Sequence, residues 1–459
     1  YWEILEPKEG TFDFTLVDSL VASARLYNLK LVLLWFGAWK NSMSCYAPEW
    51  VKTNQARFPR AVNRAGKGLE ILSAFSSNNL EADSRAFSAL MKHLRETDRE
   101  ETVIMVQVEN EIGMLTEARE YTEEANRLFT AEVPKELLSY LTKNRDLLVP
   151  ELAGHWSGNG FRTKGNWETV FGKSLATDEL FQSWYYAQYT NAIATAGSQQ
   201  YKLPMFVNAA LNHRHVEPGK YPSAGPLPHL MDIWQAAAPA LDFLSPDFYN
   251  PDFKYYNDLY TRRSNPLFIP EIRLEPSDGA KALYAVGHYH AIGFSPFSIE
   301  SAADPAEETI TKAYALLSQL SPLVLKHQGT AAMQGVLLDS IHPVDSLVMG
   351  DYKLVVSHEY TLGWSPDSKK PDWPSTAALI IEESPGNFVI AGSGIVVTFS
   401  VKGRTDRTAG ILRAHEGRFV NGRWQPGRWM NGDQDHQGRH IRFAVNDWGI
   451  QKAALYQYR

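Results

Sequence analysis

The 459-residue sequence contains one cysteine, Cys45, which excludes an internal disulfide and any zinc cluster built from several cysteines. Its 45 Lys and Arg and 52 Asp and Glu residues are interspersed, and they give a net charge of -7 without a basic run. No apolar run is long enough to span a bilayer. We therefore expect no nucleic-acid partner and no membrane span, and the composition leaves an oligomer open.

The chain begins with "YWEILEPKEGTFDF", without a start methionine or a signal peptide. We expect the true beginning, and with it the first strand of the fold, to be missing. An export signal would have been in that part, so the sequence assigns no compartment. A periplasmic or extracellular location stays open.

From residue 1 to about 330, short apolar runs alternate with amphipathic helical stretches, as in a parallel α/β protein. Apolar residues at helical spacing predict helices over 15–28, 83–97, 178–196, 279–291 and 308–327. The predicted strands are residues 1–5, 29–36, 103–111, 203–208, 241–248, 266–272 and 291–297. With a missing first strand, this series predicts a (β/α)8 TIM barrel. The alternative is an open doubly wound sheet, but no strand is followed by GxGxxG.

Beyond residue 330 the pattern changes to short strands separated by Gly, Pro, Asn and Asp turns, over 352–362, 376–384, 386–400 and 440–448. This pattern predicts a C-terminal antiparallel β-sandwich and two domains, 1–330 and 331–459. Within the second domain, residues 421–440 are rich in turn residues and contain two tryptophans. They are interpreted as a structural loop or as a rim that contacts sugar.

The stretch "MVQVENEIG" places two glutamates at the end of a buried strand. Carboxylates are costly to bury unless a partner or a reaction requires them. Strand alternation puts Gln107, Glu109 and Glu111 on one face, which we assign to the barrel interior because the opposite face is apolar. Glu111 comes last, just before Gly113, so we expect it at the barrel rim with Glu109 one layer deeper.

A second acidic strand end is "NPLFIPEIRLEP". Leu267, Ile269 and Glu271 share a face, and Pro270 indicates that ladder pairing is ending. Counting the missing strand as first, Glu111 ends the fourth strand and Glu271 the seventh. Active sites of these barrels lie at the carboxyl ends of the strands, and glycoside hydrolysis requires two carboxyl groups there. A salt bridge to an Arg such as Arg273 is the structural alternative for either glutamate.

These motifs together resemble glycoside hydrolase family 35 and its clan of retaining (β/α)8 glycosidases, in particular β-galactosidase-like members with a C-terminal β-sandwich. The most specific element is residues 107–111, "QVENE". The resemblance implies Glu111 as acid/base, Asn110 as a hydrogen-bond donor to the sugar 2-hydroxyl, and Glu271 as nucleophile. The chain departs from the family at Ile112, where a Tyr is usual, and in the loop over 36–50.

Further candidates for sugar contact come from other strand ends and from the N-terminus. Tyr249 is placed to hydrogen-bond the nucleophile, with core packing as the alternative. The other candidates are Trp39, Lys40, Asn41 and Asn208, and Glu6 with Trp2 as a wall of the site.

We expect no metal and no cofactor. The histidine pairs in 213–215 and 288–290 have zinc-like spacing but no further ligand group beside them, and the hydrolytic mechanism needs no metal. The predicted function is hydrolysis of terminal β-linked galactose-like sugars from oligosaccharides, polysaccharides or glycoconjugates. The alternatives are a related retaining glycosidase for another sugar, a catalytically silent glycan-binding barrel, and a barrel hydrolase of another class. The last would need metal ligands or a Ser-His pair, which the strand ends lack.

Overall fold

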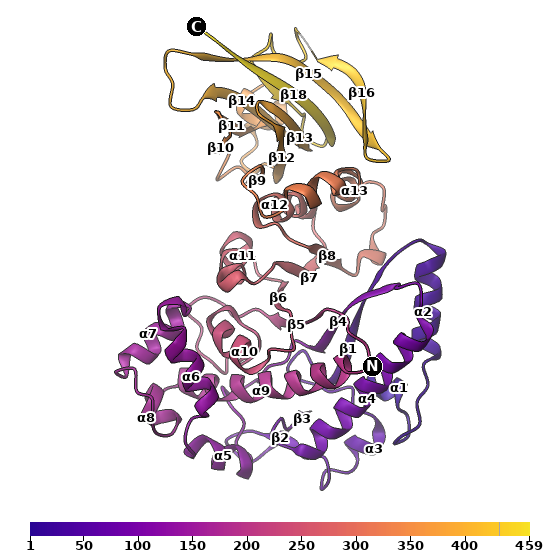
Figure 1. Ribbon diagram of the computed structural model, residues 1–459, viewed down its shortest axis with the longest axis vertical. Coiled ribbons are helices and arrows are strands. Elements are labelled where there is room, and N and C mark those ends of the chain that lie inside the picture. Colours follow the sequence, from indigo (N-terminus) through magenta and orange to yellow (C-terminus); the bar gives the residue numbers. More distant parts are fainter. Residues whose placement is uncertain (431) are drawn as a thin grey trace. The chain divides into compact units, whose positions relative to one another are not determined.

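The computed structural model describes residues 1–430 and 432–459 and divides into two compact units, Tyr1–Pro270 and Glu271–Arg459 (Figure 1). The predicted domain boundary at residue 330 stays a prediction. No helix in the described ranges is both long and apolar enough to cross a membrane.

The first unit contains a parallel sheet. Its strands β1 (Leu31–Lys40), β4 (Val103–Asn110), β5 (Met205–Ala210) and β6 (Phe243–Phe248) pair in that order, all in parallel. Helices occur between them, so the unit is a parallel half-barrel of the kind found in (β/α) barrels. A short hairpin, β2 (Arg60–Val62) and β3 (Gly68–Leu72), lies outside this sheet.

The helices of the first unit follow the predicted alternation. They are α1 (Trp2–Leu5), α2 (Thr15–Leu26), α3 (Glu49–Lys52), α4 (Ser77–Thr97), α5 (Glu123–Thr130), α6 (Lys135–Lys143), α7 (Pro150–Gly158), α8 (Trp167–Phe171), α9 (Leu175–Ser198), α10 (Met231–Ala237) and α11 (Phe253–Tyr260). The two longest, α4 and α9, pack so closely that a Cβ on Gly197 would lie 2.3 Å from the Phe87 ring.

The strand predicted over residues 1–5 is wrong, because Trp2–Leu5 is the short helix α1. Local bonds hold this turn: Glu6 accepts hydrogen bonds from Trp2 Nε1 at 2.8 Å and from the Gly10 N–H at 2.8 Å. The other six predicted strands exist, with ends shifted by up to four residues. The strand that ends at Glu111 was counted as the fourth because residues 1–5 were counted as a strand before it. Since residues 1–5 form a helix, the count no longer supports a fourth strand there.

Strand β7 (Phe268–Arg273) begins in the first unit and ends in the second. Phe268, at its start, packs with Phe206 of β5 and Phe243 of β6, with ring centroids 5.0 and 6.0 Å away. The strand continues past Glu271 to Arg273, so Pro270 does not end it as expected.

The second unit contains two antiparallel sheets, as expected for the C-terminal region. One has the order β10, β11, β14, β17, and the other β16, β15, β18, β13, β12, β9. One hydrophobic cluster draws on both, including Val356 and Val397 from the first and Ile380 and Ile390 from the second. The strands of these two sheets are β9 (Met333–Leu338), β10 (Val344–Met349), β11 (Tyr352–His358), β12 (Thr376–Ser384), β13 (Asn387–Ser393), β14 (Ile395–Val401), β15 (Thr408–Val420), β16 (Arg423–Met430), β17 (His440–Arg442) and β18 (Gly449–Tyr458). The unit also contains β8 (Gly293–Phe297), which belongs to neither of them.

Helices α12 (Asp278–Tyr289) and α13 (Thr309–His327) belong to this second unit. A hydrophobic cluster joins them to the six-stranded sheet, with Leu283 of α12 and Leu316 of α13 beside Leu379 of β12. A Cβ on Gly287 would lie 2.6 Å from Leu379, so only glycine permits this approach. These helices therefore pack against a sheet that follows them in the chain.

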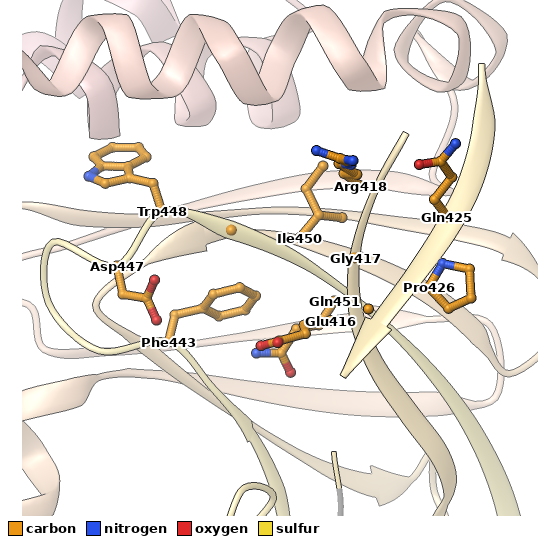
Figure 2. A pocket seen from close by; sticks show the side chains of 12 residues that line it. Glu416, Gly417, Arg418, Gln425, Pro426, Phe443, Asp447, Trp448, Ile450 and Gln451 are labelled. Carbon is orange, nitrogen blue, oxygen red and sulfur yellow. The ribbon is translucent and has the colours of Figure 1, made fainter. Parts of the chain in front are cut away.

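Residues 421–440 are not simply a loop, because β16 forms a hairpin with β15; residue 431 lies outside the described residues. The hairpin borders a hollow of about 490 Å³ in the second unit. Figure 2 shows Trp448 and Asp447 on one side of it and Gln425 and Pro426 on the other. The residues that line it all belong to the second unit, whereas Glu111 belongs to the first.

Candidate active site

Three polar side chains meet at the carboxyl ends of neighbouring parallel strands. Asn110 ends β4, Asn208 lies in β5 and Asp247 in β6, and all three are buried. Asn208 Nδ2 donates to Asp247 Oδ2 at 2.6 Å and to Asn110 Oδ1 at 3.3 Å. Asn110 Oδ1 also accepts from Gln107 Nε2 at 3.0 Å. This network fixes the side chains at three successive strand ends.

Glu111 follows β4 directly and is held through its backbone. Its N–H donates to Asn208 Oδ1 at 2.9 Å, and its carbonyl oxygen accepts from Ser42 Oγ at 2.6 Å. The Glu111 carboxylate lies within 4.8 Å of the Asp247 carboxylate. Its φ of 47° is in the left-handed region, an uncommon conformation for a residue other than glycine that is often found at functional sites. The backbone N–H and carbonyl of Glu111 are thus both fixed, and the residue as a whole is 7% exposed.

Strand alternation predicted that Glu109 and Glu111 share one face of the strand, but the two side chains have different surroundings. Its carboxyl group accepts the backbone N–H groups of Ala38 at 3.3 Å and Trp39 at 2.9 Å, and it is hydrogen-bonded to Asp83 of α4. Burial, followed by the nearby Asp83 carboxylate, raises the pKa of Glu109 well above its ordinary value. A φ of 62° at Glu109 breaks the alternation and turns its side chain toward α4.

Two predicted sugar contacts have structural surroundings instead. Trp39 is fully buried, with its ring edge-on to Tyr186 and Tyr189 at centroid distances of 5.2 and 4.9 Å. Glu6 is also fully buried, and its carboxylate binds Trp2, the Gly10 N–H and Arg85. These contacts explain why both side chains are buried, whereas the indole nitrogen of Trp39 has no hydrogen-bond partner among the described residues. The sugar contacts expected of Trp39 and Glu6 stay predictions.

Lys40 and Asn41 lie at the end of β1. Asn41 Oδ1 accepts from Asn110 Nδ2 at 3.1 Å and from Lys40 Nζ, which joins this loop to the strand-end network. Tyr249 follows β6 and is 41% exposed. Glu271 lies in β7, is half-buried and is the first residue of the second unit. The roles predicted for these residues stay predictions.

The segment after Glu111 is held by residues 221–225, which follow β5. Met114 and Ser223 exchange two backbone hydrogen bonds of 2.8 and 2.9 Å. A Cβ on Gly225 would lie 2.3 Å from the Ile112 carbonyl oxygen, so the two segments touch along their backbones. We call residues 221–225 the clamp, because they hold the backbone that begins one residue after Glu111.

Glu179 of α9 anchors this clamp. Its buried carboxylate accepts from Tyr221 OH at 2.9 Å and from the Ala224 N–H at 3.1 Å, and it pairs with His229 Nε2 at 2.9 Å. Burial lowers the pKa of His229 and the Glu179 carboxylate raises it, with a net upward shift. The contact with Glu179 therefore favours the protonated form of His229.

Sequence reasoning missed Asp247, Ser42 and Glu179. Asp247 was detectable, because it stands in "SPDFYN" at a predicted strand end two residues before Tyr249. Ser42 and Glu179 act through contacts with residues distant in sequence, and the chain alone carries no signal for such contacts. In the histidine pair over 213–215, which has zinc-like spacing, His213 Nδ1 lies 3.2 Å from Asn250 Nδ2. The expectation of no metal stays a prediction.

The parallel half-barrel, with the Glu111 and Asp247 carboxylates at its strand ends, is consistent with a (β/α) barrel. Residues 1–165 match the family model Glyco_hydro_42, described as beta-galactosidase, and residues 310–442 match a domain of unknown function, DUF5597. The first match indicates a glycoside hydrolase domain and supports a glycosidase. It is to a family other than the family 35 that the motifs resemble. No curated protein matches the chain.

Solved structures similar to the chain include several glycan-active enzymes. The beta-galactosidase from Bacillus circulans sp. alkalophilus is 14% identical with a TM-score of 0.46, over 71% of this chain and 51% of that one. The beta-1,4-D-mannanase from Cryptopygus antarcticus is 12% identical with a TM-score of 0.36, and the match covers 67% of this chain and 71% of the mannanase. An endogalactoceramidase is 13% identical with a TM-score of 0.35, and the match covers 99% of this chain and 86% of the endogalactoceramidase. The chain thus spans about half the length of the first of these.

Proposed function

We propose that the protein is a retaining glycoside hydrolase that removes terminal β-linked galactose-like sugars. The observation that carries this proposal is the position of Glu111: it follows Asn110 at the carboxyl end of a buried parallel strand, and Asn208 fixes its backbone. Active sites of (β/α) barrels lie at that end of the strands. The Glyco_hydro_42 match over residues 1–165 includes Glu111 and supports this reaction class.

In this mechanism Glu111 donates a proton to the leaving oxygen while Glu271 attacks the anomeric carbon. The sugar then forms an ester with Glu271, and water activated by Glu111 releases it with its configuration retained. The Asp247 carboxylate lies within 4.8 Å of the carboxylate of this proposed proton donor. Asn110 is proposed to bind the sugar 2-hydroxyl.

The assignment of Glu271 is supported by chain continuity. Glu271 is three residues beyond Phe268, whose ring packs with Phe206 of β5 and Phe243 of β6. A strand advances about 3.3 Å per residue, so three residues cover roughly 10 Å in the direction of the carboxyl ends. We further propose that the two C-terminal sheets form a β-sandwich, since one hydrophobic cluster draws on both.

A panel of 4-nitrophenyl glycosides tests this function. The panel contains the α and β anomers of galactose, glucose, mannose and fucose, and it is incubated with the full chain and with its Glu111→Gln variant. Release of nitrophenol from the β-galactoside is expected. Cleavage of another β-glycoside would correct the sugar alone, and no cleavage of any member would contradict the proposed function.

A further inference from the structure

A large β-bulge in β1 lies beside the candidate active site. The pairing of β1 with β4 (Figure 1) breaks after Trp35 and resumes at Lys40, so residues 36–39 all lie opposite the single residue Glu109. Bulges interrupt the backbone ladder, and they are frequent next to active sites, where they redirect side chains. The backbone groups inside this bulge therefore need partners other than the ladder.

Glu109 supplies two of these partners. The N–H groups of Ala38 and Trp39, inside the bulge, donate to its carboxyl group at 3.3 and 2.9 Å. The same carboxyl group is hydrogen-bonded to Asp83 of α4, and both side chains are fully buried. Asp83 in turn accepts from Tyr189 OH of α9 at 3.2 Å. The pair therefore joins the bulge to two helices of the first unit.

Hydrogen bonds rather than ion pairs hold this pair of carboxyl groups. Among the described residues, no Lys, Arg or His contributes to the surroundings of Glu109 or Asp83, and the other titratable groups nearby are Tyr189 and Cys45. Two buried carboxyl groups form a hydrogen bond to each other only while one of them carries a proton. An amide at Glu109 can therefore replace the protonated group, and an apolar side chain cannot.

The residues that follow the bulge contact Asn110 and Glu111. Asn41 and Ser42 come directly after β1, with φ values of 56° and 57° in the left-handed region. Asn41 Oδ1 accepts from Asn110 Nδ2 at 3.1 Å, and Ser42 Oγ donates to the Glu111 carbonyl oxygen at 2.6 Å. A Cβ on Gly113 would lie 2.5 Å from Ser42 Oγ, so these segments are closely packed. The conformation of the bulge thus decides where both contacts are made.

We propose that Glu109, held by Asp83, is a positioning residue for Glu111. Its carboxyl group fixes the bulge, and the bulge places the two residues after β1 that hold Asn110 and the Glu111 backbone. The inference rests on the proposed glycosidase function, in which Glu111 is the acid, and it adds a buried residue that acts through the main chain. A small displacement of a catalytic group slows the step in which that group takes part.

Two substitutions of Glu109 separate this role from packing. Glu109→Gln keeps an acceptor for the bulge and a donor to Asp83, so its kcat/KM should stay within about twofold of the wild type. Glu109→Met keeps the volume but loses the acceptor. Its kcat/KM should fall about tenfold for an alkyl glycoside of the sugar accepted in the panel, whose leaving group needs the proton of Glu111. A dinitrophenyl glycoside, which needs no such proton, should lose less than about threefold.

The matched control is Glu96→Met, which replaces an exposed glutamate of α4 and should change neither substrate. Equal losses of Glu109→Met on the two leaving groups would show a general structural effect and overturn the positioning role. Full activity of Glu109→Met would overturn it as well.

A double-mutant cycle tests the connection from the bulge to Glu111. Ser42→Ala removes the hydroxyl that bonds to the Glu111 carbonyl, and it should lower kcat/KM for the alkyl glycoside about fivefold with the same leaving-group contrast. Combined with Glu109→Met, it should cost little more than Glu109→Met alone, because both changes interrupt one series of contacts. Losses that multiply in the double variant would contradict this connection. Ser42→Ala also supplies the kinetic test if Glu109→Met does not fold.

Hydrogen exchange followed by mass spectrometry tests the bulge without turnover. Backbone amides over 36–42 and 110–114 should exchange faster in Glu109→Met and stay protected in Glu109→Gln and Glu96→Met. Unchanged exchange in Glu109→Met would contradict the proposal. If the panel gives no hydrolysis at all, the proposed function fails, and the exchange rates still decide whether Glu109 holds the bulge.

Discussion

Glu109 and Asp83 form a hydrogen-bonded pair of fully buried carboxyl groups behind the candidate active site. Asp83 also accepts from Trp35 Nε1 at 2.8 Å and from Tyr189 OH at 3.2 Å. A Cβ on Gly37 would lie 2.7 Å from Glu109 Oε1 and 2.8 Å from Asp83 Oδ1, so glycine is needed for this packing. Burial raises the pKa of both groups, and it raises that of Glu109 well above its ordinary value, which favours a proton on Glu109.

A neutral replacement of Glu109 should therefore be tolerated. Glu109→Gln keeps a donor toward Asp83, so its free energy of unfolding should fall by about 1 kcal/mol or less. Asp83→Ala leaves the donors of Trp35 and Tyr189 without an acceptor and should cost about 3 kcal/mol. Urea unfolding of both variants measures the difference. Similar losses in the two would contradict a proton on Glu109.

Glu120 makes stability depend on pH. Burial raises the pKa of Glu120 to about 7, although hydrogen bonds from Ser73 and Thr122 lower it. Between its ordinary value of 4.5 and about 7, the folded state keeps a proton that the unfolded state releases, so stability should fall as pH rises through this window. The contribution is at most about 3 kcal/mol.

Urea titrations from pH 4.5 to 7 compare the wild type with Glu120→Gln and with the exposed control Glu123→Gln. The decline should be reduced in Glu120→Gln alone. The same decline in all three proteins would mean that Glu120 is ionised in the folded state.

Glu179 is expected to position Glu111 through the clamp. Glu179→Gln removes the charge that raises the pKa of His229 but keeps an acceptor for Tyr221. The pKa of His229, followed by NMR, should fall because burial lowers it and only the smaller effect of Glu151 still raises it. kcat should fall about tenfold with little change in KM, since the effect is on the acid rather than on substrate binding. Glu217→Gln, an exposed change on the same loop, is the control. An unchanged kcat beside a shifted His229 would remove the positioning role.

Glu111 is expected to act as general acid. Glu111→Gln should lower the rate by about 10² to 10⁴ for an alkyl glycoside, whose leaving group needs a proton. A dinitrophenyl glycoside, with a good leaving group, should lose much less in the glycosylation step. Steady-state and pre-steady-state rates on both substrates measure the contrast. Equal losses would argue against proton donation by Glu111.

The long barrel elements were predictable, because apolar period and length distinguish the strand over 103–111 from the helix over 178–196. The sequence analysis expected three helices of the first unit, those over 15–28, 83–97 and 178–196, and did not list its shorter ones. Residues 1–5 were assigned wrongly, since "YWEIL" has strand-forming residues while the helix depends on the bond from Trp2 to Glu6. The prediction also missed β9, β10, β15, β16 and β18. Two of them, β10 and β16, carry many exposed side chains and so lack a strong apolar signal.

The candidate site was predictable only in part. Glu111 followed from its strand end, but alternation also placed Glu109 on the same face, one layer deeper. The left-handed backbone at both residues, which separates them, has no marker in the sequence. Trp39 was expected at a sugar, yet aromatic neighbours on α9 bury it. Such tertiary contacts are decided by distant segments of the chain.

The central claim, retention through a covalent bond to Glu271, is tested most directly by trapping that bond. A 2-deoxy-2-fluoro glycoside of the accepted sugar, with a dinitrophenolate leaving group, forms the intermediate faster than it breaks down. Mass spectrometry of the inactivated protein should then find one added glycosyl group, and digestion should locate it at Glu271 in the peptide "FIPEIR". A label on another residue, or a hydrolysis product of inverted configuration by NMR, would contradict the account.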